Sequence, residues 1–156
     1  MNLKSSFNQL ESLLTKVGGS LQCVVLLLLR VYWGWQFFET GRGKLMNLDR
    51  TAGYFASLDI PLPKLNALCA GTTECVGGLL LLVGLGTRVV SVPLLGVLAV
   101  AYLTAESEAL HAIFSDPDKF TAATPFLFLL AVVIVFAFGP GRLSLDAWLK
   151  RPGAAK

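Results

Sequence analysis

Two charged residues lie inside long apolar segments of this chain. Arg30 interrupts the apolar stretch 21–38, and Glu74 lies near the centre of the apolar stretch 65–85. A charged side chain that faces lipid costs about 2.5–3.5 kcal/mol, so both are expected to face the protein interior. At ~1.5 Å per residue they lie about 13 Å and about 16 Å from the same face of the membrane. We therefore predict that they form an ion pair, directly or through water.

An Arg30–Glu74 pair has two interpretations, and the sequence leaves both open. The pair could only hold two helices in register, because losing one partner leaves an uncompensated buried charge. It could also form a polar pocket at the membrane midplane that binds a headgroup or relays protons. Glu74 is then the candidate proton relay, because it is the carboxylate at the centre of a predicted span.

Small residues accompany both charges at helical spacing. Two stripes share this pattern: Arg30, Gly34, Phe37 and Gly41 in one, and Ala67, Gly71, Glu74 and Gly78 in the other. Residues three and four positions apart lie on one face of a helix, and small residues let two helices approach closely. We predict that these two faces pack against each other.

The elements that must position these residues are membrane-spanning helices. The chain of 156 residues is 54% hydrophobic and 15% charged, with a mean hydropathy of +0.67, whereas average proteins are about a quarter charged. Roughly 20 apolar residues cross a membrane as a helix. Four stretches reach or approach this length: 21–38, 65–85, 89–105 and 125–138. The predicted fold is therefore all-α, an integral membrane four-helix transmembrane bundle.

The chain before the first span is predicted to be a separate helix. Apolar residues recur there at helical spacing, namely Leu3, Phe7, Leu10, Leu14 and Val17. We interpret residues 1–20 as an amphipathic helix on the membrane surface, residues 21–143 as the transmembrane domain, and residues 144–156 as a short cytoplasmic segment. In that last segment Ser144 is expected to cap a short helix with Asp146 in its first turn.

Basic residues set the predicted orientation. With four spans, both termini lie on the same face as the turn at Arg88. That face carries seven basic residues, and the opposite face carries five: Arg42, Lys44, Arg50, Lys64 and Lys119. Because basic residues favour the cytoplasmic side, both termini are predicted to be cytoplasmic in a bacterial inner membrane. The net charge of +3 includes no basic run, so nucleic acid is not an expected partner.

Several kinds of chemistry lack the residues they would need. The three cysteines form no Cys-x-x-Cys pair, which argues against thiol–disulfide exchange within the chain. The single histidine, His111, lies near carboxylates that do not have the spacing of a known metal site. Neither a metal nor a covalently bound cofactor is expected.

Three groups of residues, taken in order, resemble the DoxX family of membrane proteins. They are Leu29-Arg30 with Gly41-x-x-Lys44-Leu45, Glu74-Cys75-Val76-Gly77-Gly78 with Gly84-x-x-Thr87-Arg88, and Gly139-Pro140-Gly141-Arg142-Leu143-Ser144-Leu145-Asp146. The family is related to the DoxD subunit of thiosulfate:quinone oxidoreductase and looks like four-helix membrane proteins. The resemblance marks Arg30, Gly41, Lys44, Glu74, Arg88 and Asp146 as positions of the family pattern and gives them no chemical role.

The resemblance implies a membrane partner of a redox enzyme, at most a quinone-linked subunit that depends on another protein for electrons. The predicted quinone pocket consists of Arg30, Trp33, Phe37 and Glu74. In it Arg30 donates to the carbonyl oxygens, the aromatic residues contact the ring and Glu74 passes protons. The expected partners are membrane lipid, a redox protein and further copies of the chain. The alternative is a non-enzymatic scaffold or a carrier of a small solute.

Overall fold

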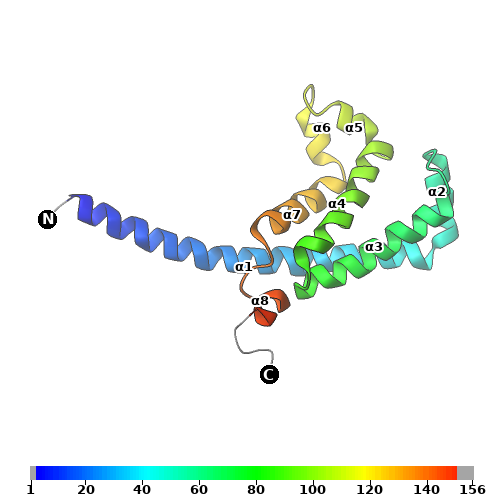
Figure 1. Cartoon of the computed structure of the whole chain (residues 1–156). Coiled ribbons are helices and arrows are strands. Elements are labelled where there is room, and N and C mark those ends of the chain that lie inside the picture. The colour runs from blue at the N-terminus through cyan, green and yellow to red at the C-terminus, as the bar shows by residue number, and fades with distance from the viewer. Residues whose placement is uncertain (1–2, 151–156) are drawn as a thin grey trace.

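The computed structural model of the protein describes residues 3–150, with side chains from Phe7 onward. Helices make up most of this part of the chain (Figure 1). In chain order they are α1 (Leu3–Met46), α2 (Leu48–Ser57), α3 (Pro63–Val83), α4 (Thr87–Thr104), α5 (Ser107–His111), α6 (Pro117–Ala122), α7 (Pro125–Phe138) and α8 (Leu145–Leu149). The prediction of an all-α protein is confirmed.

Three of the described helices are long and apolar enough to cross a membrane: α1, α3 and α4. The helix α7 is also apolar but has 14 residues, which rise about 21 Å at ~1.5 Å per residue. The predicted spans 65–85, 89–105 and 125–138 agree with α3, α4 and α7 to within two residues at each end. The first predicted span, 21–38, lies within the longer helix α1.

The helix α1 is a single element of 44 residues, so the helix predicted over residues 1–20 is not a separate element. At ~1.5 Å per residue its length is about 66 Å. Gly18 and Gly19, at the predicted boundary, lower helix propensity by about 1 kcal/mol each relative to alanine, but they retain their amide groups and the helix continues through them. In Figure 1 the N-terminal part of α1 extends away from the other helices.

Glycines bring α1 and α3 into close contact. A Cβ atom on Gly41 would lie 2.3 Å from the backbone nitrogen of Cys75, and one on Gly78 would lie 2.5 Å from the backbone nitrogen of Phe38. No side chain fits at such distances, so only glycine allows the two backbones to approach this closely. The prediction that the two small-residue faces pack against each other is confirmed.

The hydrophobic core lies where α1, α3, α4 and α7 meet. Its buried cluster consists of Phe37, Leu81, Leu94, Leu98, Val132 and Val135. Pro93 lies inside α4, and a membrane helix tolerates such a proline because neighbouring groups can satisfy the freed carbonyl. The core therefore joins helices from both halves of the chain.

The segment after α7 is attached to the turn between α3 and α4. Asp146 accepts hydrogen bonds from the backbone amides of Gly86 and Thr87, at 2.8 Å and 3.1 Å, which satisfies amides left free at the start of α4. Partial burial disfavours the charged carboxylate, but these hydrogen bonds outweigh it and hold the pKa of Asp146 below its ordinary value. Ser144 caps α8 by accepting from the amide of Ala147, as predicted.

Asp146→Ala is expected to lower the free energy of unfolding by about 1–2 kcal/mol at neutral pH, because it uncaps α4. Since the folded-state pKa of Asp146 is depressed, its stabilisation is present above the unfolded pKa of about 3.9 and is lost as the pH falls through the folded pKa. Thermal unfolding in detergent should therefore show that wild type loses more stability on acidification than Asp146→Asn does. Superimposable pH profiles would contradict this role.

Candidate functional site

Glu74 lies at the centre of α3 and is buried against Lys44 of α1. Lys44 Nζ lies 2.5 Å from Glu74 Oε2, and Glu74 is only 6% exposed. An ammonium and a carboxylate in direct contact form a charge-assisted hydrogen bond, which is stronger than one between neutral groups. The pair therefore holds a titratable group in the interior of the bundle with its charge compensated.

The predicted ion pair between Arg30 and Glu74 is wrong. Within the described part of the chain the ionic partner of Glu74 is Lys44, whereas Arg30 donates a hydrogen bond to the backbone carbonyl of Leu143. Arg30 is 1% exposed, and among the described residues its Nε and Nη1 atoms have no hydrogen-bond partner. Its guanidinium lies against Gly84, where a Cβ atom would overlap Nη1. Arg30 therefore links α1 to the segment that follows α7.

The helix register explains the difference. Membrane depths counted from the start of the predicted first span, residue 21, place Arg30 opposite Glu74. In the structure, Arg30 lies at the level of Gly84, and Gly41 lies at the level of Cys75. The stretch of α1 from Arg30 to Gly41 rises about 16 Å, or about three turns. Glu74 is adjacent to Cys75 and therefore lies far along the helix from Arg30, within reach of Lys44 instead.

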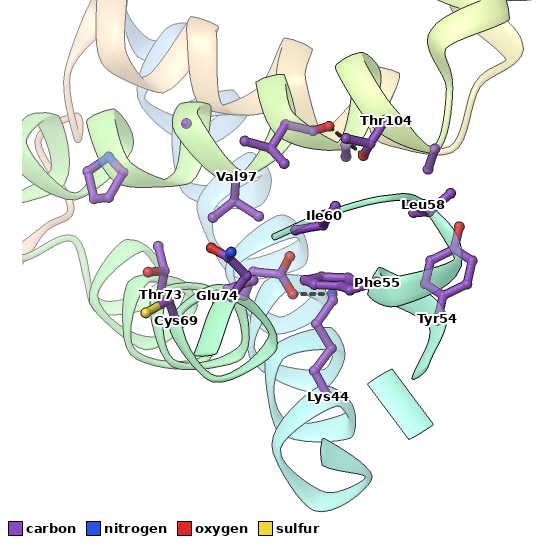
Figure 2. Close-up of a pocket in the computed structure, with 17 residues that line it drawn as sticks. Lys44, Tyr54, Phe55, Leu58, Ile60, Cys69, Thr73, Glu74, Val97 and Thr104 are labelled. Carbon is purple, nitrogen blue, oxygen red and sulfur yellow. Dashed lines mark hydrogen bonds and ion pairs between the residues drawn. The ribbon is translucent and has the colours of Figure 1, made fainter. Parts of the chain in front are cut away.

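A cavity of about 400 Å³ lies beside the ion pair, between α2, α3 and α4. Lys44 and Glu74 form part of its wall, and the rest of the wall is mainly apolar. Other lining residues include Tyr54, Phe55, Cys69, Thr73, Val97 and Thr104 (Figure 2). Small-molecule sites are typically cavities of this kind, in which a few polar groups are placed on an apolar wall.

The short helix α2 forms one side of the cavity. Figure 2 shows the Phe55 ring next to the Lys44–Glu74 pair, with Tyr54 farther from it. Asp49 at the start of α2 binds Lys64 at the start of α3, at 2.9 Å. This contact links the first turn of α2 to the first turn of α3, and both side chains are exposed. The helix α2 itself packs mainly against α3.

The four residues of the predicted pocket lie in different places. Trp33 and Phe37 both pack against Phe128 of α7, with ring centroids 4.7 Å and 4.8 Å apart. Phe37 belongs to the buried core. The cavity wall does not include Arg30, Trp33 or Phe37. Of the four predicted residues, Glu74 is the one that lines the cavity.

The other positions of the family pattern have contacts of their own. Arg88 donates hydrogen bonds to the carbonyls of Phe136 and Ala137, at 3.2 Å and 3.3 Å, and so satisfies carbonyls at the end of α7 that have no partner within the helix. Gly41 lies at the closest approach of α1 and α3. Of the residues in the family pattern, Lys44 and Glu74 are the two that line the cavity.

Lys44 and α2 are the parts of the site that sequence analysis did not assign to it. Lys44 was expected at the external rim, but a lysine has a long flexible stem that lets its ammonium reach inward from a helix end. Leu48, Ala52 and Phe55 recur at helical spacing, which would have predicted an amphipathic α2. Its place over Glu74 depends on the turn that follows it, where Asp59 and Leu62 have positive φ angles of 56° and 46°.

Comparison with known proteins gives one family match and several relatives. The sequence profile of the DoxX family matches residues 25–107. "Uncharacterized membrane protein Rv3486" of Mycobacterium tuberculosis is 33% identical over 83% of this chain and 84% of that protein. "Putative oxidoreductase CatD" of Bacillus subtilis is 32% identical over 79% and 85%, and "Inner membrane protein YphA" of Escherichia coli is 31% identical over 82% and 92%. No solved structure matches the chain.

Proposed function

This chain belongs to the DoxX family of membrane proteins, and we propose that its cavity binds a quinone-like headgroup within a membrane redox complex. The observation that carries the proposal is a mainly apolar cavity with a buried ion pair, Lys44–Glu74, in its wall. The name of the Bacillus subtilis relative, "Putative oxidoreductase CatD", is consistent with a redox role.

A quinone headgroup needs an apolar space for its ring and hydrogen-bond donors for its carbonyl oxygens. The cavity volume of about 400 Å³ lies within the range of small-molecule sites. The ammonium of Lys44 is the charged donor in the cavity wall, in the role that the sequence suggested for Arg30. Phe55 lies next to the ion pair (Figure 2) and takes the stacking role suggested for Phe37.

Reduction of a quinone to a quinol takes up two electrons and two protons. In this proposal a redox partner protein supplies the electrons, and Glu74 passes the protons one at a time, returning to its carboxylate form after each transfer. Lys44 neutralises that carboxylate between transfers. The chain is then a subunit of a quinone-linked oxidoreductase, and its own residues bind the substrate and deliver protons.

We expect a short-chain ubiquinone or menaquinone analogue to protect Cys69 from a maleimide, because this thiol is exposed and lines the cavity. The assay uses purified protein in which Cys23 and Cys75 are alanine. Val97→Trp, which fills the cavity, should abolish the protection. Val92→Trp is the matched control, because Val92 is an exposed residue of the same helix outside the cavity wall.

Glu74→Gln separates binding from proton transfer, because glutamine keeps the size and hydrogen bonding of glutamate but does not titrate. Saturable protection should persist in this variant, while quinone reduction in membranes that contain the electron donor should be lost. An absence of saturable protection in folded wild-type protein would rule out the quinone proposal. Flux of a small solute into proteoliposomes without a redox partner would favour the carrier alternative.

We also propose that α7 is the fourth membrane crossing of a four-helix bundle. The start of α4 is capped by Asp146, and the last turn of α7 is bound by Arg88 of α4, so α4 begins and α7 ends on the same face. If α4 crosses the membrane, α7 must cross back. The short α7 can do so if the bilayer thins locally or flanking residues contribute. The basic residues then favour cytoplasmic termini in an inner membrane, and the name of the Escherichia coli relative also refers to an inner membrane.

The orientation predicts which engineered cysteines an impermeant thiol reagent reaches in intact cells. In a chain whose native cysteines are alanine, Ser115→Cys should react, because the α5–α6 connection is external. Ser12→Cys and Ala155→Cys should react only after the cells are permeabilised. Labelling of the two terminal positions but not of position 115 would mean that the topology is inverted.

A further inference from the structure

A continuous apolar stripe runs along α1, and no other described part of the chain covers it. Its members are between 44% and 65% exposed: Phe7, Leu10, Leu14, Val17, Leu21, Val24, Leu28, Val31 and Trp35. Their spacing alternates strictly between three and four residues. This is the spacing of the seam between the helices of a coiled coil.

The stripe lies on the side of α1 that faces away from the bundle. Arg30, Gly34, Phe37 and Gly41 are buried on the side that faces α3. At roughly 100° per residue, the centre of this buried face lies about 150° from the centre of the apolar stripe. A partner can therefore cover the stripe along its full length without displacing α3, α4 or α7.

Lipid alone does not account for the N-terminal part of the stripe. The length of α1 is about 66 Å, whereas the hydrocarbon core of a bilayer is about 30 Å thick. In Figure 1 the N-terminal part of α1 extends beyond the other helices. Outside a bilayer, a helix gains most of its stability from the packing of its apolar face rather than from helix propensity, so the part of α1 beyond the bilayer needs a partner.

The polar face of the same segment favours protein over lipid headgroups as that partner. Between Leu3 and Gln22, α1 carries two basic residues, Lys4 and Lys16, and one acidic residue, Glu11. Helices that lie on a membrane surface usually have a polar face rich in lysine and arginine, which attracts anionic lipid. The side chains of this segment carry a net charge of only +1, so that attraction is weak.

We propose that two copies of the chain pair in parallel through this stripe, forming a coiled coil that begins outside the bilayer and continues into the membrane. Copies inserted in the same orientation are related by a twofold axis along the membrane normal, which places each seam residue opposite its own counterpart. Leu14 and Leu21 then share one core position of the heptad, and Leu10 and Val17 share the other.

Cysteine crosslinking in native membranes tests the pairing. The variants Leu14→Cys and Val17→Cys lie on the seam, and Ser12→Cys and Lys16→Cys are controls on the opposite face, all in a chain whose native cysteines are alanine. Mild oxidation should give a disulfide-linked product of twice the 16.7 kDa monomer mass at the two seam positions. The product should be roughly five-fold weaker or more at the two controls.

A second measurement uses the chain with its native cysteines. Leu14→Asp combined with Val17→Asp should convert a dimer in mild detergent to a monomer, as read by native mass spectrometry, without changing the thermal unfolding of the bundle. Crosslinking that is absent or equal at all four positions, or a monomeric wild type, would overturn the proposal. Burial of position 14 in lipid without crosslinking would identify a surface helix instead.

Discussion

Lys44→Met is expected to destabilise the folded protein by roughly 3–5 kcal/mol, because it leaves the carboxylate of Glu74 buried without a partner. Glu74→Leu should cost less, since the partly exposed Lys44 can move its ammonium toward water along its flexible stem. The double variant, Lys44→Met with Glu74→Leu, should recover most of the lost stability because no buried charge remains.

Unfolding of the purified protein in mixed detergent, followed for wild type, both single variants and the double variant, gives the coupling between the two residues. The exposed pair Lys64–Asp49 is a matched control with a similar contact distance, and it should show no measurable coupling, since solvent screens exposed ion pairs. Strict additivity at Lys44 and Glu74 would mean that the pair does not form. Coupling between Arg30 and Glu74 instead would restore the pairing that the sequence suggested.

Gly41→Ala is expected to destabilise the protein by about 3 kcal/mol, at the upper end of the usual cost of overpacking. The new Cβ would lie 2.3 Å from the backbone nitrogen of Cys75 and 2.7 Å from the carbonyl oxygen of Gly71. Both contacts are with backbone atoms, which cannot move aside as a side chain can. The two helices must therefore separate along their most closely packed stretch.

Gly43→Ala is the control for this substitution, because it lies two residues away on the same helix and its Cβ would meet no atom within 4 Å. Without a steric cost, alanine should leave stability unchanged or raise it by up to about 1 kcal/mol through its higher helix propensity. Thermal unfolding of both variants in the same detergent gives the comparison. Equal stability of the two would show that α1 and α3 do not approach closely at Gly41.

Composition and local sequence patterns are enough to predict the class of the protein and most of its elements. An apolar composition with few charges requires a membrane, and runs of apolar residues with Gly and Pro at their ends located α3, α4 and α7. The spacing of small residues determined which faces of α1 and α3 meet, because a glycine stripe is useful only where two backbones touch.

Which charges meet, and where a cavity forms, depends on how the helices pack against one another. Both Arg30 and Lys44 are basic residues of one helix, and only the register of α1 against α3 selects Lys44 as the partner of Glu74. A shift of about three turns in that register changes the pairing completely, while the pattern of apolar residues stays nearly the same, so hydrophobicity cannot determine it. The cavity depends in addition on α2, which is placed over Glu74 by a tight turn and by long-range packing against α3.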